Sequence, residues 1–424
     1  MASAIPPDAP APQAGAGALV RHAKLWLVPT VLSALVALVL SLLYMGGILN
    51  PSDSLRRLPI ALVDEDRSRP LPGQRQNLGK QLAASVSSAG PSDTVRWRRL
   101  GLAAAEDELA SGKVFGALII PDGFTTSVGA LTTSRATVRP TLTVLTNPGL
   151  GSLGSSLAAQ INQTAAHRAS LELGKQLTAS AAVPTTRLLL TDPVTVTTRV
   201  GHPIGRHSGL GLTAFYYTLL LVLSGFIGGN LVNSGVDTAL GYADSEIGPW
   251  HTRRPTVPIS RTQTLLLKML MTAGISVLTT TLVMVATVSI LGMDATHLPM
   301  LWLFSYCATV AVGLGVQAIN AAFGGIGQLV SMFVFIALAL PSSGATVPLE
   351  ATPGFYRFLA TFEPMRQLSS GVRSLLYFDA RADAGLTRGW TMIAVGFVLA
   401  LAFGFAMTHY YDRRGLRRLT PQPA

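Results

Sequence analysis

The chain has 424 residues, of which 49% are hydrophobic and only 12% are charged, whereas soluble domains usually contain about 25% charged residues. This composition excludes a protein built from soluble domains alone. The net charge of +11 also requires nucleic-acid binding to be tested against the positions of the basic residues.

The first segment of the chain, 1–20, is rich in Ala and Pro and has no apolar periodicity, which predicts a disordered tail. The following segment, 21–44, contains the uncharged run 25–44. Because about 20 apolar residues suffice to span a membrane, this segment predicts a first transmembrane helix. No small-x-small cleavage pattern follows it, which favours an uncleaved signal anchor over a signal peptide.

The next region, 45–210, has short apolar strands that alternate with helical stretches, a pattern typical of an α/β domain. The patterns predict strands at 58–63, 114–120, 140–146 and 193–199, and helices at 74–86, 102–110, 124–131 and 152–179. The chain has a single cysteine, Cys307, outside this region. An apolar core must therefore hold the domain together without disulfides.

Five further uncharged apolar runs follow and predict transmembrane helices at 211–233, 269–291, 299–323, 326–345 and 390–409. The predicted fold class is a polytopic α-helical membrane protein with six transmembrane helices and an extracytoplasmic α/β domain inserted between the first and second helices. The region 211–410 then forms a five-helix transmembrane domain, and 411–424 forms a basic tail.

Three basic segments that flank these predicted helices fall on the same side, and the positive-inside rule places that side in the cytoplasm. Their basic residues are Arg21, Lys24, Arg253, Arg254, Arg261, Lys268, Arg413, Arg414, Arg417 and Arg418. Both termini are thus expected in the cytoplasm, with 45–210 and 346–389 outside. Because these side chains can meet anionic lipid headgroups and no basic stripe interleaved with aromatic residues occurs, we expect no nucleic-acid partner.

A glycine motif in the α/β region, formed by Gly149, Gly151 and Gly154, matches the spacing of a dinucleotide-binding fingerprint. That fingerprint needs an acidic residue at the end of a second parallel strand. Here the acidic residue at the right distance, Glu172, falls inside a helical pattern. We therefore interpret the glycines as a turn before a helix, and we expect no cofactor.

Three segments carry a resemblance to a known family. The first, 58–66, is an apolar strand that ends in three acidic residues. The second, 105–124, contains a helix, a strand and an Ile-Pro-x-x-Phe turn. The third precedes the last predicted helix and includes Pro341, Gly344, Pro348, Pro353, Glu363, Pro364 and Arg373. Together they resemble the YhgE/Pip (phage infection protein) branch of type 2 ABC exporter permeases.

The resemblance implies a permease half in a bacterial cytoplasmic (cell) membrane that moves an amphipathic or hydrophobic substrate outward. Its expected partners are a separate ABC ATPase subunit, a second permease half and the lipid bilayer, and the chain itself is not expected to be an enzyme. Some members of such families resemble type VII secretion accessories or phage-entry factors. A non-transporting scaffold or receptor that acts through its outer domain is therefore the alternative.

The energy source is constrained by what the sequence lacks. It contains no G-x-x-x-x-G-K-[ST] loop, so ATP hydrolysis would have to come from another chain. None of the six predicted spans contains Asp, Glu or Arg, whereas ion-coupled carriers usually hold such residues within their spans. Lys268 and His409 lie at predicted borders, where Lys268 can snorkel. Ion-coupled transport is therefore disfavoured, and we expect no catalytic or metal-binding residues.

Force from a partner ATPase would enter through 234–264, the only substantial loop on the predicted cytoplasmic side. The candidate coupling residues in this loop are Asp237, Asp244, Glu246, Arg253, Arg254 and Arg261. An ordinary solvated loop that obeys the positive-inside rule is an equally supported interpretation.

Small and polar residues within the predicted spans indicate where helices pack. Gly225 and Gly229 form a G-x-x-x-G pattern that permits close helix contact, and packing within the chain is favoured over a dimer interface. Interhelical hydrogen bonds account for the amide side chains Asn230, Asn233, Gln317, Asn320 and Gln328, and a substrate path is the alternative.

The predicted outer loop 346–389 is divided by Pro353 and Pro364. Its apolar and basic residues predict short amphipathic helices at the membrane surface. We expect these helices either to gate a transport pathway or to act as a surface anchor. The candidate gate residues are Pro341, Gly344, Pro348, Pro353, Glu363, Pro364 and Arg373.

Overall fold

The computed structural model describes residues 23–47, 49, 51–88, 93–131, 139–178, 191–416 and 418. The chain forms two compact units, residues 1–46 and residues 47–424. The predicted tail 1–20 and the end of the basic tail, 419–424, lie outside the described residues.

The first unit contains one described helix, α2 (Ala23–Gly46), which includes the predicted first span. Its described side chains are largely apolar and exposed, including Leu27, Leu35, Leu38 and Leu42. A helix satisfies its own backbone hydrogen bonds, so an apolar surface of this kind suits a lipid environment.

The second unit contains a five-stranded sheet with the order β2-β1-β3-β4-β5. Its strands are β1 (Leu58–Asp64), β2 (Val95–Leu100), β3 (Gly116–Ile120), β4 (Thr141–Thr146) and β5 (Thr195–Val200). All neighbouring pairs are parallel except β3 and β4, which are antiparallel. The four predicted strands are confirmed and correspond to β1, β3, β4 and β5.

Strand β2 was not predicted, because three of its six residues are arginines and it therefore lacks an apolar run like that of β1. The arginines are explained by the position of β2 at the edge of the sheet, where charged side chains protect against pairing with strands of other chains. Arg98 forms an ion pair with Glu108 at 2.5 Å. Val95 and Trp97 instead pack into the apolar clusters on the other face of the strand.

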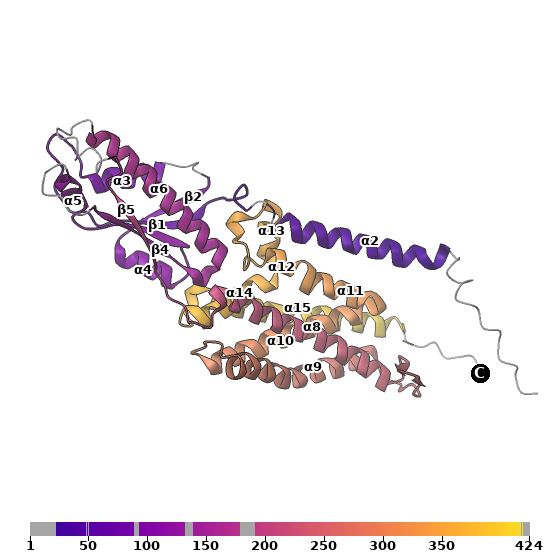
Figure 1. Ribbon diagram of the computed structural model, residues 1–424. Helices are drawn as coiled ribbons and strands as arrows, with labels where there is room; N and C mark the ends of the chain where they lie inside the picture. Colours follow the sequence, from indigo (N-terminus) through magenta and orange to yellow (C-terminus); the bar gives the residue numbers. More distant parts are fainter. Residues whose placement is uncertain are drawn as a thin grey trace, which may run out of the picture. The chain divides into compact units, whose positions relative to one another are not determined.

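Helices cover both faces of this sheet (Figure 1). On one face, α3 (Leu78–Ser88), α5 (Phe124–Ala130) and α6 (Ser152–Thr178) enclose the largest apolar cluster of the region. On the other face, α4 (Leu102–Ala110) packs Ala105 and Leu109 against β1 and β3. The four predicted helices are confirmed. However, α3 begins four residues later than expected, because Asn77 caps it by accepting a hydrogen bond from Lys80 N at 3.0 Å.

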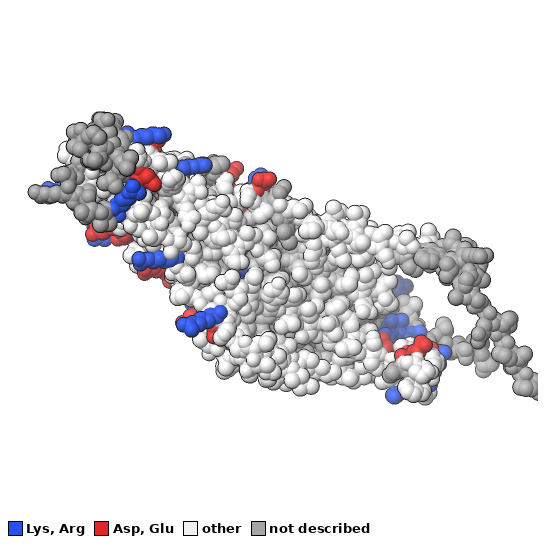
Figure 2. Space-filling model, in the orientation of Figure 1, with Lys and Arg blue, Asp and Glu red and all other residues white. Residues whose placement is uncertain are grey.

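The remainder of the second unit is helical and contains four stretches that are long and apolar enough to cross a membrane. They are Thr213–Ala239, Arg261–Ile290, Leu298–Ser342 and Leu386–Arg413. The helices that form them include α8 (Thr213–Ala239), α9 (Arg261–Met284), α10 (Leu298–Phe323) and α15 (Leu386–Arg413). Together they indicate a membrane-embedded protein. In Figure 2 the charged side chains of this bundle lie near its ends, and its flank is uncharged on the face shown.

Helix α10 packs against α8, α9 and α15. The stretch that begins with it reverses at Gly324, whose φ is +59°, a conformation that favours glycine. The returning limb consists of α11 (Gly327–Met332), a π-helical turn (Phe333–Ala337) and α12 (Ala339–Ser342). It lies back along α10, since the Phe335 ring contacts the position of Gly315.

Two shorter helices follow, α13 (Gly354–Phe362) and α14 (Pro364–Tyr377), and both are amphipathic as predicted. Their boundaries coincide with the prolines, because proline is accommodated at or just before the first helical residue. Helix α14 buries Leu368, Val372 and Leu375 in the core of the helical region. Helix α13 exposes Phe355, Phe358 and Phe362.

Candidate functional site

Several distant chain segments meet at one end of the helical bundle. The Asp412 carboxylate of α15 accepts hydrogen bonds from Arg261 N and Thr262 N at the start of α9, both at 3.0 Å. The Tyr411 hydroxyl donates to the carbonyl of Ala322 at 2.9 Å, beside the reversal at Gly324. The α8–α9 connection, the α10–α11 reversal and the end of α15 therefore share one end of the bundle.

A buried ion cluster lies at this end. Lys268 Nζ on α9 is 2.8 Å from Asp237 Oδ1 on α8 and 2.7 Å from Asn233 Oδ1. Arg418 also pairs with Asp237 through both carboxylate oxygens. Its guanidinium lies 5.0 Å from the centre of the Tyr242 ring, which adds a cation–π contact.

The expectation that Lys268 snorkels towards water is wrong. Its side chain turns inward and only 4% of the residue is exposed. The reason is that Asp237 supplies a counter-charge on the neighbouring helix, and a buried cation is stable only when it is paired. Asp237 lies on α8, which extends to Ala239, and is engaged within the bundle, although we expected it to be presented to a partner ATPase.

A small cavity of about 20 Å³ adjoins the cluster and has Asn233, Lys268, Thr408 and Arg418 in its wall. That volume holds about one water molecule, which excludes an organic ligand at this position. Across the described part of the chain, no group of three or more His, Cys, Asp or Glu side chains is placed to hold a metal ion. The cluster is therefore suited to joining helices.

A layer of amide side chains continues from the ion cluster into the bundle. Gln317 Nε2 on α10 donates to the carbonyl of Gly229 at 2.8 Å and to Thr272 Oγ1 at 3.0 Å. Asn320 Nδ2 donates to Asn230 Oδ1 at 3.1 Å. The predicted interhelical hydrogen bonds of these amides are confirmed, and they join α8, α9 and α10. Gln328 is exposed.

Gly225 and Gly229 lie where α8 packs against α10. A Cβ atom at position 225 would lie 2.6 Å from the carbonyl oxygen of Thr309. One at position 229 would lie 3.1 Å from Val316 Cβ. The absence of side chains therefore permits close approach of two helices of the same chain.

An exposed hairpin follows α8, formed by β6 (Ser245–Ile247) and β7 (Trp250–Thr252). Trp250 is 72% exposed. Asp244 lies 3.6 Å from His251 and 3.5 Å from Arg253. We did not predict this hairpin, although the Gly248-Pro249 dipeptide is a turn signal and Gly248 has a φ of +59°.

The candidate coupling residues therefore divide into two groups. Asp237 and Arg261 lie in the end of the bundle, where the Arg261 guanidinium is 5.3 Å from the centre of the Tyr411 ring. The others lie on or beside the exposed hairpin: Asp244, Glu246, Arg253 and Arg254.

Glu363, a candidate gate residue, is only 4% exposed and lies at the start of α14. Its carboxylate accepts hydrogen bonds from Met365 N and Arg366 N, both at 3.0 Å, so it caps the helix. Burial raises the pKa of this carboxyl to about 7, and the two hydrogen bonds offset only part of that effect. Pro353 and Pro364 lie at the starts of α13 and α14.

Arg373, another candidate gate residue, is buried in α14. Its Nη2 donates to the carbonyl of Ala345 at 3.1 Å and lies 3.5 Å from the Cβ position of Gly151 in the α/β region. Burial lowers the pKa of the guanidinium to about 10. A Cβ atom built at Gly154 would lie 3.5 Å from Pro348. Pro341 is part of α12, and Gly344, just after that helix, has a φ of +66°. Arg373 and Pro348 thus contribute to the junction between the sheet region and the helices.

Tyr377 and Phe378, at the end of α14, complete this junction. The Tyr377 hydroxyl donates to the carbonyl of Ser208 at 3.2 Å and accepts from Ala214 N at 3.1 Å. The Phe378 ring contacts the position of Gly149, where a Cβ atom would lie 2.9 Å from it. The glycine motif therefore serves packing and forms a turn that leads into α6, the helix that contains Gly154 and Glu172. This agrees with our interpretation of the motif as a turn before a helix.

Residues 29–396, most of the chain, match the family described as "Protein of unknown function (DUF3533)". The chain belongs to the DUF3533 family. No curated protein and no solved structure matches this DUF3533 chain. The matched region includes Asp237, Lys268 and the exposed hairpin, whereas Asp412 and Arg418 lie beyond it.

Proposed function

We propose that this DUF3533 chain is the membrane-spanning permease half of an ABC-type exporter. In this proposal it moves an amphipathic or hydrophobic substrate outward and is driven by a separate ATPase subunit. The observation that carries the proposal is the exposed β6–β7 hairpin at the end of α8, with Trp250 on its surface. Exposed aromatic side chains with neighbouring charges are typical of contact points for partner proteins.

The loop that carries the hairpin is joined to the end of α8 by hydrogen bonds at its base. Val257 N donates to the carbonyl of Leu240 at 3.1 Å, and the Tyr242 hydroxyl donates to the carbonyl of Val257 at 2.7 Å. The Asp237–Lys268 pair joins the last turn of α8, from which this loop continues, to α9. A partner that moves the hairpin would therefore move both helices, and α10 packs against each of them.

The proposed topology has six spans, which are α2, α8, α9, α10, the limb α11–α12 and α15. The stretch Leu298–Ser342 has 45 residues. A straight helix of that length would extend about 68 Å, about twice the thickness of a hydrocarbon core, so the reversal at Gly324 is assigned to a membrane boundary.

The positive-inside rule supports an orientation for this topology. It assigns the bundle end that carries Arg253, Arg254, Arg413 and Arg414 to the cytoplasm, together with both termini. The sheet region is then extracytoplasmic, and the membrane is proposed to be a bacterial cell membrane. A second permease half, either identical or homologous, would complete the exporter.

Energy from a separate ATPase fits the charges of the bundle better than ion coupling. The pair of Asp237 and Lys268 is the nearest approach to an ion relay among the described residues of the helical stretches. However, Asp237 lies in the last turn of α8, where Arg418 also reaches it. A charge fixed at one end of the bundle does not provide a path across a membrane.

The test is a purification of the full chain from its native membrane in mild detergent, followed by mass spectrometry for a P-loop ATPase. We expect a stoichiometric ATPase that is lost when Glu246, Trp250 and Arg254 are replaced together by Ala. Val200→Ala, which truncates an exposed apolar side chain on β5, is the control and should retain it. Absence of an ATPase from the unaltered chain, with an envelope protein bound through 45–210, would contradict the proposal and support a scaffold or receptor.

A further inference from the structure

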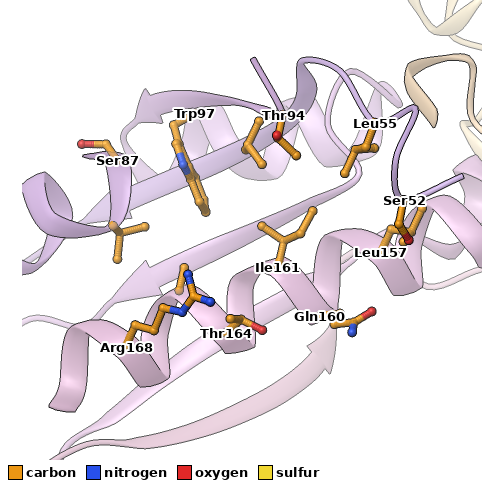
Figure 3. A pocket seen from close by; sticks show the side chains of 13 residues that line it. Ser52, Leu55, Ser87, Thr94, Trp97, Leu157, Gln160, Ile161, Thr164 and Arg168 are labelled. Atoms are coloured by element: carbon orange, nitrogen blue, oxygen red, sulfur yellow. The ribbon is translucent and has the colours of Figure 1, made fainter. Parts of the chain in front are cut away.

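A cavity with a volume of about 300 Å³ lies in the sheet region (Figure 3). It forms because neither α3 nor α6 covers the edge strand β2. Helix α3 packs on β1, and α6 packs on β3, β4 and β5, which leaves the adjoining face of β2 open between them. A volume of this size is at the lower end of the range for small-molecule sites.

The inner wall of the cavity is apolar. Trp97 of β2 points into it, and Leu157 and Ile161 of α6 lie opposite (Figure 3). Val95 and Ala165 extend this apolar wall. Such a wall favours an apolar body, because binding removes apolar surface from water on both partners.

The polar side chains of the lining include one cation at the rim of the cavity. Arg168 lines the cavity from α6, and Ser87 lines it from the end of α3 (Figure 3). The Ser87 hydroxyl accepts a hydrogen bond from Arg99 Nη2 at 2.7 Å, which holds a second guanidinium beside the rim. The described lining contains no Asp or Glu.

Arg168 is available to a ligand. In the described part of the chain it takes part in no ion pair, although the adjacent His167 lies 3.9 Å from Asp192. A guanidinium at the mouth of an apolar cavity, with no acid in the wall, selects for negative charge. A neutral or cationic head group would find no comparable partner.

We propose that this cavity binds an amphiphile with a slender apolar body and one anionic head group. The body lies against Trp97, Leu157 and Ile161, and the head group meets Arg168. The proposal does not depend on the exporter function, because every residue it uses lies in the sheet region. A scaffold or a permease can hold such a site.

The test uses the full chain, labelled with 5-fluorotryptophan, in nanodiscs of zwitterionic phosphatidylcholine. Decanoate is the anionic probe, decanol the neutral probe and decyltrimethylammonium the cationic probe. The fluorine resonance of Trp97, assigned with Trp97→Phe, reports on the cavity itself. We expect decanoate to shift this resonance saturably at the lowest concentration of the three probes.

Matched variants separate a specific site from partition into the bilayer. Arg168→Gln should weaken decanoate binding about tenfold, the effect of losing one charge-assisted hydrogen bond, and leave decanol unchanged. Arg199→Gln, which removes an exposed arginine on β5 outside the cavity, should change the binding of neither decanoate nor decanol. Ala165→Leu, which extends a side chain into the cavity, should weaken the binding of both decanoate and decanol.

Two results would overturn the proposal. One is a Trp97 resonance that does not respond saturably to decanoate. The other is an equal response to decanoate and decyltrimethylammonium that Arg168→Gln leaves unchanged. Neither result affects the exporter proposal, which is tested through the β6–β7 hairpin and an ATPase.

Discussion

Lys268 and Asp237 form an ion pair of 2.8 Å between two helices, although both side chains are largely removed from water. Removing charges from water is unfavourable unless other groups satisfy the remaining hydrogen-bonding capacity. Asn233 and Arg418 supply those groups on either side of the pair. The pair therefore depends on three chain segments and fixes how α8, α9 and the end of the chain meet.

Asp237→Asn should strongly destabilise the helical bundle, because it leaves Lys268 buried without its counter-charge. Breaking one side of a buried pair typically costs about 3–5 kcal/mol. Thermal unfolding of the full chain in detergent measures the effect, with Glu246→Gln on the exposed hairpin as the control. The double variant Asp237→Asn with Lys268→Met should lose less unfolding free energy than the two single variants lose in sum. Equal stability of Asp237→Asn and Glu246→Gln would refute this prediction.

Gly225→Ala should destabilise the contact between α8 and α10. Its new Cβ atom would lie 2.6 Å from the carbonyl oxygen of Thr309. Overpacking of this kind costs about 1–3 kcal/mol. Gly228→Ala is a matched control on the same helix, because its Cβ position has no neighbour within 4 Å. A thermal unfolding temperature that falls equally for both variants would show that the close contact is not responsible.

Glu363 should make stability depend on pH in the neutral range. Burial raises the pKa of its carboxyl from the ordinary 4.5 to about 7 in the folded state. Between these values the folded chain binds more protons than the unfolded chain, so this group's contribution to stability decreases as pH rises towards 7. Unfolding temperatures measured across that window should show the slope, and Glu363→Gln should reduce it. The exposed Glu106→Gln should not alter it, and an unchanged slope in Glu363→Gln would exclude Glu363 as its source.

Asp66 should have the opposite dependence. Burial opposes ionisation of its carboxyl, but hydrogen bonds from Thr125, Ser68 and Gly79 outweigh burial and lower the pKa. The stabilisation is therefore present above the ordinary pKa of about 3.9 and is lost as pH falls through the folded value.

Asp66→Asn should consequently cost about 1–3 kcal/mol at pH 7, and the difference from the unaltered chain should shrink in acid. Thermal unfolding of both chains at neutral and acidic pH measures this difference. Asp93→Asn, on an exposed residue, is the control. A difference that stays constant in acid would show that Asp66 ionisation contributes nothing.

The sequence alone was sufficient for features that depend on local pattern. The short apolar run 58–63 predicted β1, and the amphipathic segments beside Pro353 and Pro364 predicted α13 and α14. The long uncharged runs predicted apolar helices. These features can be predicted because periodicity, length and proline act on neighbouring residues, whatever the rest of the chain does.

Only the tertiary structure decided which distant residues meet. The inward turn of Lys268 depends on Asp237 and Arg418, which no local pattern connects to it. Strand β2 was not predicted, because only its position at the edge of the sheet explains why a strand contains three arginines. The cavity beside Trp97 likewise arises from how α3 and α6 lie on the sheet. Pairing, edges and cavities are properties of the packed chain, since each requires segments far apart in sequence to be brought together.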